Sequence, residues 1–220
     1  MNTLTNLPLE APSIPAAERD GLIKVRDLDL GISVHFTARG LIKEKDSFEV
    51  MINGVGSGIT QTISDPNAPE EVAFVMNLEG EHFAKDGNYA IGYQWLTFPG
   101  GMRTDSATTE IRIDRTAPGA ALLAPMLFHQ INLGETLTGI IPGYADMQPG
   151  DRIQTLCNEQ EGPVHEVTPD NLTERPVQII FDKAFLLDLD SESITMSYQV
   201  IDRAGNRSIM ARPVTLSMQD

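Results

Sequence analysis

The 220-residue chain is predicted to be all-β and to fold as two tandem antiparallel β-sandwich domains. Three observations support this prediction. Short apolar runs with a period of two, the pattern of half-buried strands, recur along the chain between Gly, Pro, Asn and Asp turn residues. Helical periodicity is confined to one or two turns. The second half repeats the plan of the first at a constant offset, and about a hundred residues can bury one core.

The repeat has an offset of 105 residues, which is the difference between 48 and 153 and again between 93 and 198. Identity between the copies is sparse, but the parity of the apolar positions agrees throughout. A slip of one residue would turn a whole apolar face to solvent, so agreement in parity indicates shared strands. The aligned pairs are Asp46 with Asp151, Phe48 with Ile153, Asn53 with Asn158, Val72 with Val177, Tyr93 with Tyr198, Gln94 with Gln199 and Gly100 with Gly205.

Each copy contains six or seven predicted strands whose alternate residues face the core. A short helical turn is expected at 185–189, with a counterpart at 82–86, and residues 54–58 are expected to form a hairpin loop. The predicted core faces are Ile32, Val34 and Phe36; Phe48, Val50 and Ile52; Val72, Phe74 and Met76; Tyr89, Ile91, Tyr93 and Trp95; Ile111 and Ile113; Ile153, Thr155 and Cys157; Val177, Ile179 and Phe181; Ile194, Met196, Tyr198 and Val200; and Val214, Leu216 and Met218.

The repeat and the prolines define three segments. Residues 1–17 carry prolines at positions 8, 12 and 15 and are predicted to be an extended Pro-rich arm. Residues 18–117 are predicted to be the first sandwich domain and residues 118–220 the second. The boundary follows the proline- and glycine-containing stretch 114–119.

Composition excludes several classes of function. The chain has 31 acidic and 16 basic side chains, a net charge of −15, whereas nucleic-acid binding depends on Lys and Arg. The first residues lack the basic and apolar regions of a Sec signal peptide. No apolar run reaches the length of a membrane span. A single cysteine, Cys157, excludes an internal disulfide; its alignment with Ile52 predicts a buried, unreactive thiol.

Three segments resemble a known family. Residues 86–89, Asp-Gly-Asn-Tyr, are similar to the entry of the penultimate strand in bacterial immunoglobulin-like domains, where the tyrosine hydroxyl bonds back to nearby backbone. Asp202, Gly205 and Asn206 lie in a segment that resembles the Asp-x-Ala-Gly-Asn hairpin of the same domains. Residues 113–118, Ile-Asp-Arg-Thr-Ala-Pro, are similar to the junctions between tandem copies. Tyr89, Tyr93 and Tyr198, with these hairpin residues, are therefore predicted to have structural roles.

The resemblance implies tandem immunoglobulin-like domains of a large bacterial surface or adhesin protein. The expected function is non-enzymatic: the end loops would bind a protein or a surface glycan, and neighbouring copies in a longer array or particle are further expected partners. The expected location is the bacterial cell surface or secretion by a non-Sec route. Two alternatives are a phage virion or secretion-apparatus component and a carbohydrate-binding module. No catalytic arrangement of residues can be assigned.

The loop that follows the longest stripe of the first copy is the predicted binding site. Trp95, Phe98 and Met102 surround two adjacent glycines, and aromatic side chains with mobile glycines are typical of contact surfaces. Trp95 has the parity of the core residue Tyr93, which favours burial. Phe98 is harder to bury and is the better candidate.

Acidic side chains indicate a second, different site. Asp114 lies at the domain junction, and Asp188 and Asp190 are two residues apart, as are Asp27 and Asp29. In an extended segment such pairs point the same way, and calcium prefers carboxylate ligands. Calcium is therefore the one cofactor predicted, at Asp114, Asp188 and Asp190. The alternative is a set of solvated acidic loops.

Overall fold

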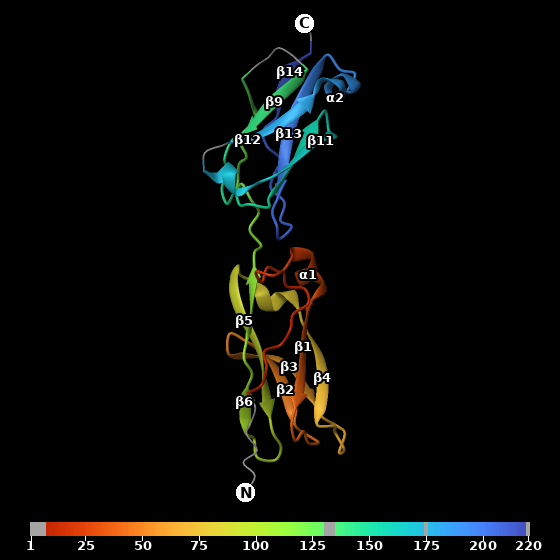
Figure 1. Cartoon of the computed structure of the whole chain (residues 1–220), viewed down its shortest axis with the longest axis vertical. Helices are drawn as coiled ribbons and strands as arrows, with labels where there is room; N and C mark the ends of the chain where they lie inside the picture. Colours follow the sequence, from red (N-terminus) through yellow and green to blue (C-terminus); the bar gives the residue numbers. More distant parts are fainter. Residues whose placement is uncertain (1–7, 130–134, 174–175, 219–220) are drawn as a thin grey trace. The chain divides into compact units, whose positions relative to one another are not determined.

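A computed structural model describes residues 8–129, 135–173 and 176–218. The chain divides into two compact units, Met1–Arg115 and Thr116–Asp220, which we call domain 1 and domain 2 (Figure 1). Both are antiparallel β-sandwiches, as predicted. No helix in the described part of the chain is long and apolar enough to cross a membrane.

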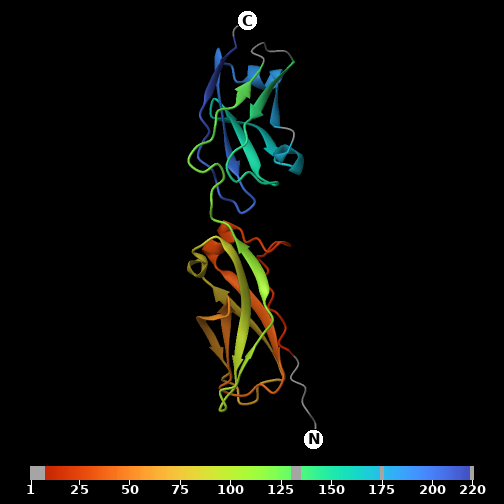
Figure 2. The same ribbon diagram turned by 90° about the vertical axis from the view of Figure 1, so that its left-hand side faces the viewer.

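Domain 1 is built from two sheets that face each other (Figures 1 and 2). The first pairs β1 (Ile32–Arg39) with β4 (Glu71–Leu78). The second has the order β3-β2-β5-β6, and β7 also pairs with β5. Its strands are β2 (Ser47–Ile52), β3 (Val55–Thr62), β5 (Gly87–Leu96), β6 (Arg103–Asp105) and β7 (Thr109–Ile113).

The core of domain 1 follows from the alternation of these strands, because every second side chain faces the opposite sheet. Phe36 and Phe74 come from the first sheet, and Phe48 and Tyr93 come from the second. The rings of Phe36 and Tyr93 stack with centroids 3.9 Å apart, and those of Phe48 and Phe74 are 4.5 Å apart. All four rings bury apolar area between the sheets, and the Phe48–Phe74 pair lies at a distance where aromatic contacts add stability beyond that burial.

The N-terminal segment 8–17 packs on domain 1. Ser13 and His35 exchange both backbone hydrogen bonds, at 2.8 and 2.9 Å, so this segment is an edge of the first sheet. The Leu9 carbonyl accepts a bond from Ala107, beside the second sheet. Leu9 and Ile14 are buried in the same core as the strands. The extended segment predicted as an arm therefore contributes two core side chains, and only residues 1–7 of it lie outside the described residues.

Two short helices close one end of domain 1: α1 (Val25–Leu30) and the 3-10 helix η1 (Gly80–Phe83). The expectation that Asp27 and Asp29 lie in an extended segment is wrong, because both belong to α1. Burial of Leu28 fixes this turn, and residues two apart on a helix do not share a face.

Domain 2 repeats the arrangement. One sheet has the order β12-β9-β8 and the other β11-β10-β13-β14. The short helix expected at 185–189 is present as α2 (Lys183–Asp188), and the 3-10 helix η2 covers Pro169–Leu172. The strands are β8 (Leu127–Phe128), β9 (Thr136–Ile141), β10 (Arg152–Cys157), β11 (Gln160–Glu166), β12 (Val177–Asp182), β13 (Ser193–Ile201) and β14 (Val214–Ser217).

The offset of 105 residues also relates irregular features of the two domains. The register of β2 with β3 shifts between Glu49 and Met51, and that of β10 with β11 shifts between Gln154 and Leu156. Asn53 and Asn158 both have positive φ. Each accepts a backbone bond of 2.8 Å through its side chain, from Ala90 and from Thr195 respectively. The two domains thus share a register shift and an asparagine turn as well as their strand positions.

The prediction of a hairpin loop over 54–58 is wrong, because β3 begins at Val55. The turn is confined to Asn53 and Gly54. Gly56 lies in the strand, and the Glu49 side chain passes over it. An added Cβ at position 56 would lie 2.3 Å from Glu49 Oε1. That same oxygen accepts a hydrogen bond from the Gly58 N–H at 3.0 Å. The glycines therefore accommodate a side chain at the bulge, and a phosphate loop is not formed.

Candidate functional site: the loop end of domain 1

Two loops of domain 1 meet at one end of the sandwich. One joins β1 to β2 (residues 40–46) and the other joins β5 to β6 (residues 97–102). Ser47 pairs with Leu96, and Leu96 pairs with Arg103, so the register places the two loops side by side. We call this pair of loops the loop end.

Buried Asp46 ties the two loops together. Its side chain has no solvent exposure (0%) and accepts three hydrogen bonds. One oxygen accepts from the Lys43 N–H at 3.0 Å and from Trp95 Nε1 at 3.1 Å. The other accepts from the Phe98 N–H at 2.8 Å. A buried carboxylate with several donors fixes the backbone around it, so both loops are held in one conformation.

Three apolar side chains project from this fixed backbone. Leu41 is 63% exposed, Phe98 49% and Met102 63%. The Lys45 ammonium lies 5.3 Å from the centre of the Phe98 ring, within the range of a cation–π contact. Exposed apolar side chains on a preorganised backbone are suited to contact with another molecule, because little conformational entropy is lost on binding.

The structure places the predicted binding residues in two settings. Phe98 and Met102 lie on the exposed surface of the loop end. Trp95 is only 9% exposed and packs against Phe48, with ring centroids 5.4 Å apart, so it supports the loops from the core. Leu41 was missed, because loop residues follow no period. Asp46, which clamps the two loops together, could have been identified from its alignment with Asp151, because each aspartate lies just before a strand.

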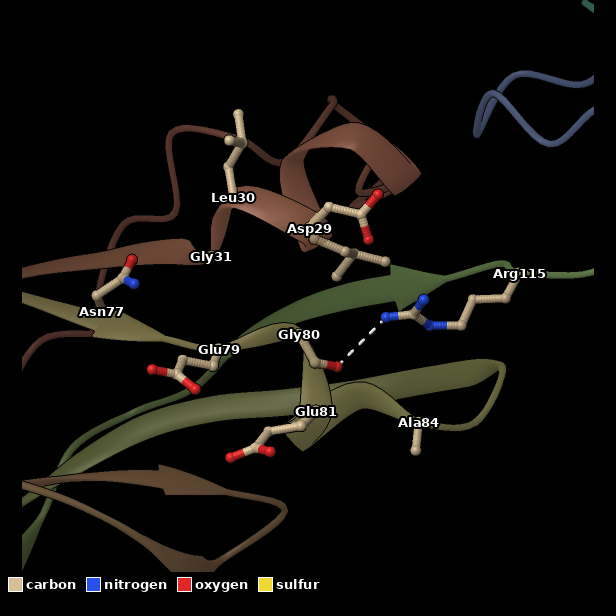
Figure 3. Close-up of a pocket in the computed structure, with 10 residues that line it drawn as sticks. Asp29, Leu30, Gly31, Asn77, Glu79, Gly80, Glu81, Ala84 and Arg115 are labelled. Carbon is tan, nitrogen blue, oxygen red and sulfur yellow. Dashed lines mark hydrogen bonds between the residues drawn. The ribbon is translucent and has the colours of Figure 1, made fainter.

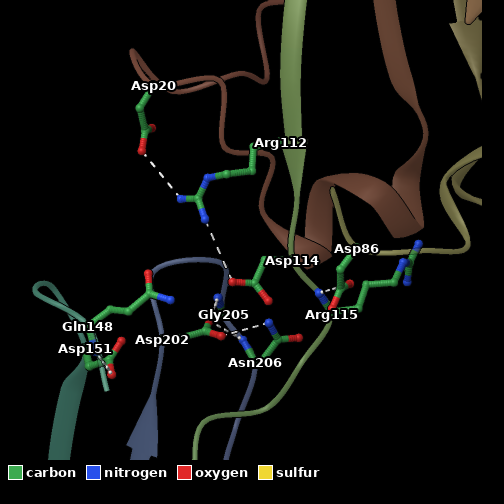
Figure 4. Close-up of polar contacts among 10 residues, drawn as sticks. All are labelled: Asp20, Asp86, Arg112, Asp114, Arg115, Gln148, Asp151, Asp202, Gly205 and Asn206. Carbon is green, nitrogen blue, oxygen red and sulfur yellow. Dashed lines mark hydrogen bonds and ion pairs between the residues drawn. The ribbon is translucent and has the colours of Figure 1, made fainter. Parts of the chain in front are cut away.

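The predicted structural residues make the expected turn contacts. The Tyr89 hydroxyl donates to the Lys85 carbonyl at 2.8 Å, which is the tyrosine-corner bond. In domain 2, Asp202 Oδ1 accepts from the N–H groups of Gly205 and Asn206 at 2.7 and 2.8 Å (Figure 4). Gly205 has a φ of 95°, which favours glycine. This carboxylate caps its hairpin.

The aligned residues Tyr93 and Tyr198 differ in one contact. The Tyr198 hydroxyl donates to the Ala124 carbonyl at 2.8 Å. The Tyr93 hydroxyl is buried and has no hydrogen-bond partner among the described residues. A buried polar group without a partner costs free energy. The tyrosine hydroxyl therefore destabilises domain 1 at this position and stabilises domain 2.

This difference predicts opposite effects of the same substitution. Tyr198→Phe should lower the free energy of unfolding of domain 2 by about 1–3 kcal/mol, because it leaves a carbonyl unpaired. Tyr93→Phe should leave domain 1 unchanged or slightly more stable, because it removes an unpaired hydroxyl. Urea denaturation of both variants measures the difference. Equal losses in the two variants would show that Tyr93 has a partner as strong as that of Tyr198.

The predicted calcium ligands lie in different settings. In domain 1, Asp114 Oδ2 is 3.9 Å from Arg112 Nη1, and Arg112 Nη2 is 3.4 Å from Asp20 (Figure 4). In domain 2, Asp188 ends α2 and Asp190 follows with a φ of 44°, so the expected extended geometry of this pair is wrong. Within the described residues, no three His, Cys, Asp or Glu side chains form a metal cluster. Calcium binding stays a prediction, which melting temperatures with added calcium and with EDTA would test.

A hollow of about 650 Å³ lies between α1 and η1 (Figure 3). Asp29, Glu79 and Glu81 contribute carboxylates to its lining. The Arg115 guanidinium crosses one side and donates to the carbonyls of Gly80 and Phe83 at 3.3 and 3.0 Å. Its cation is therefore used to hold η1, and the hollow is mainly acidic.

Cys157 is buried as predicted, and burial raises the pKa of its thiol to about 11. An acid whose pKa is higher in the folded state contributes stability below its unfolded pKa and loses that contribution as pH rises. Domain 2 should therefore lose roughly 1 kcal/mol between about pH 9 and 10. Urea denaturation at the two pH values measures this loss. In Cys157→Ala the loss should be smaller by roughly this amount, and the part that remains comes from Tyr144 and Tyr198, whose pKa values burial also raises. An unchanged loss would assign all of it to groups other than Cys157.

Comparison with known proteins gives structural similarity only. No family model and no curated protein matches the sequence. Among solved structures, the chain is similar to fibronectin(III)-like modules of Clostridium thermocellum CbhA, with 13% identity, 94% of both chains covered and a TM-score of 0.44. It is also similar to a structure of a 1.5-MDa bacterial ice-binding adhesin described for host cell surface retention, with 16% identity and a TM-score of 0.49. That match covers 96% of this chain and 64% of the other, so this chain spans slightly less than two thirds of the adhesin chain.

Proposed function

We propose that this protein is a non-enzymatic, adhesin-type binding module of a bacterial cell surface, and that the loop end of domain 1 binds a partner protein. The observation that carries the proposal is the group of exposed Leu41, Phe98 and Met102 on a backbone held by buried Asp46. Apolar and aromatic anchors at the centre of a contact supply most of the energy of protein association. The surface location rests on the similarity of residues 86–89, 113–118 and 202–206 to bacterial surface domains.

The character of the loop end favours a protein partner over a glycan. Sugar rings are usually held on several exposed aromatic side chains. In the described residues, Phe98 is the one aromatic among the exposed large hydrophobic side chains, and Trp95 is buried. Leu41 and Met102 add exposed apolar side chains on the same two loops, and phenylalanine and methionine are both enriched in protein interfaces.

The proposal is tested by selecting ligands for the intact chain from a peptide-display library and comparing variants. Leu41→Ser, Phe98→Ser and Met102→Ser, combined in one chain, should abolish binding of the selected peptides. Leu187→Ser is the matched control, because Leu187 is 59% exposed on α2 of domain 2 and should leave binding unchanged.

Two results would contradict the proposal. The first is that no selected peptide binds the original chain more tightly than it binds the triple variant. The second is a glycan array in which the original chain binds and the triple variant does not, since this would assign the loop end to a sugar. Trp95 fluorescence of the triple variant confirms that domain 1 remains folded, because Trp95 is the single tryptophan.

A further inference from the structure

A second hollow in domain 1, of about 390 Å³, lies where the N-terminal segment separates from β1. Glu10, Ala11 and Ser13 line it on one side, and Thr37 and Arg39 of β1 line it on the other. Phe36, Phe74 and Tyr93 lie toward the core. The hollow has the size of a small ligand site, and its lining is independent of Leu41, Phe98 and Met102.

The hollow exists because the N-terminal segment changes sheets. Ser13 is paired with His35 of β1, whereas Leu9 is paired with Ser106 beside the second sheet. Pro12 lies at the crossing, and its carbonyl accepts a bond from the Thr109 hydroxyl. The chain leaves β1 at this residue, because Leu9, three residues earlier, already lies beside the second sheet.

The crossing leaves an open backbone edge on β1. Backbone groups of successive residues in an antiparallel strand point alternately to the two neighbouring strands. His35 directs its N–H and carbonyl to Ser13, so Thr37, two residues further, directs its own toward the same side. In residues 8–17, the described part of the N-terminal segment, Ser13 is the residue paired with β1, and the edge of Thr37 borders the hollow.

Beside the backbone groups of Thr37, the hollow contains a second polar group that is available for a hydrogen bond, the hydroxyl of Tyr93. Tyr93 is 1% exposed, and its hydroxyl has no hydrogen-bond partner in the described part of the chain. Burial raises the pKa of this phenol, the Glu10 carboxylate raises it further and Arg39 lowers it. The hydroxyl is therefore protonated and able to donate. In domain 2 the aligned Tyr198 donates to a backbone carbonyl, that of Ala124.

A pair of exposed charged side chains forms the rim. Arg39 Nη1 lies 3.7 Å from Glu10 Oε1, and Arg39 Nη2 lies 3.2 Å from Glu71 Oε1. Exposed ion pairs of this kind contribute little free energy, so Glu10 and Arg39 can separate at low cost. Their opposite charges also favour an uncharged occupant.

We infer that this hollow is a binding site for an extended peptide segment of a partner, which pairs with the edge of β1 at Thr37 and places a backbone carbonyl on the Tyr93 hydroxyl. A peptide unit supplies both the acceptor that Tyr93 lacks and the donor and acceptor that match Thr37. Addition of a strand to an open sheet edge is a general mode of peptide recognition. The site is separate from the loop end, so each proposal stands or fails without the other.

The test is an NMR titration of the intact, ¹⁵N-labelled chain with N-acetyl-alanyl-alanine N-methylamide. Saturable shifts of the Thr37 and Arg39 amide signals are expected, with a dissociation constant on the order of 1 mM. Tyr93→Phe should weaken binding about threefold to tenfold, the effect of one hydrogen bond. Tyr198→Phe is the matched control, and its domain 1 signals should titrate as in the original chain.

Three results would overturn the inference. Shifts that stay linear up to the solubility of the peptide would show that no site is present. Equal affinity of the original chain and Tyr93→Phe would show that the hydroxyl takes no part. A crystal structure of the peptide-soaked chain with only water in the hollow would show that solvent, and not a peptide, satisfies Tyr93.

Discussion

Replacement of Asp46 by alanine is expected to lower the free energy of unfolding of domain 1 by about 3–5 kcal/mol. The Asp46 side chain is fully buried and accepts bonds from Lys43, Trp95 and Phe98. Alanine would leave these three N–H donors without their acceptor, and the bond from Trp95 is itself buried. An unpaired buried donor costs roughly 1–3 kcal/mol, and the two part-buried backbone donors add to this loss. The loss is measured by urea denaturation followed through Trp95 fluorescence.

Two further variants isolate the cause. Asp46→Asn keeps the shape but replaces one acceptor oxygen with a donor, so it should lose about half as much. Asp105→Ala is the matched control: its carboxylate is exposed and bonds Gln94 at 2.7 Å, and its removal should change stability by no more than about 0.5 kcal/mol. Equal stability of Asp46→Ala and Asp105→Ala would contradict the role of Asp46 as the clamp of the loop end.

The second large effect is expected from Asp151→Ala, which should destabilise domain 2 by about 2–4 kcal/mol. Asp151 is 1% exposed and accepts from the Tyr144 hydroxyl at 2.9 Å and the Gln148 N–H at 3.0 Å. Burial raises the pKa of Tyr144, as does the neighbouring Asp151 carboxylate, so this hydroxyl remains a donor at neutral pH. Without Asp151, both donors would lose their buried acceptor.

Cys157 provides the measurement for domain 2, because it is the single cysteine and lies buried in that core. A thiol reagent modifies it only when domain 2 opens, so the labelled fraction at each urea concentration reports unfolding. Asp188→Ala is the control, because Asp188 is exposed at the end of α2. A labelling curve for Asp151→Ala that coincides with the control would show that the buried carboxylate does not stabilise domain 2.

The strand faces could be predicted from the sequence because burial imposes a period of two. Phe48, Tyr93, Ile153 and Tyr198 all face a core as expected. Features without a period were missed. The helix α1 has only six residues, too few to show a helical period. The prolines of the N-terminal segment indicated an extended arm, whereas part of this segment pairs with the edge of a sheet and buries Leu9 and Ile14.

The candidate site was only partly predictable, for a similar reason. Phe98 and Met102 were found because an aromatic and a flexible apolar side chain flank glycines. Leu41 lies in the other loop, and nothing in the sequence shows that the two loops meet. Their meeting depends on the pairing of β2 with β5 and on the side-chain bonds of Asp46. Such long-range contacts determine a binding surface but leave no local pattern.

The most direct test of two separately folded sandwich domains is urea denaturation of one chain followed by both probes, Trp95 fluorescence for domain 1 and Cys157 labelling for domain 2. Asp46→Ala should move the Trp95 transition to lower urea and leave the Cys157 transition in place. Asp151→Ala should do the reverse. Transitions that move together by equal amounts in either variant would show that the chain unfolds as one cooperative unit, and would contradict the account.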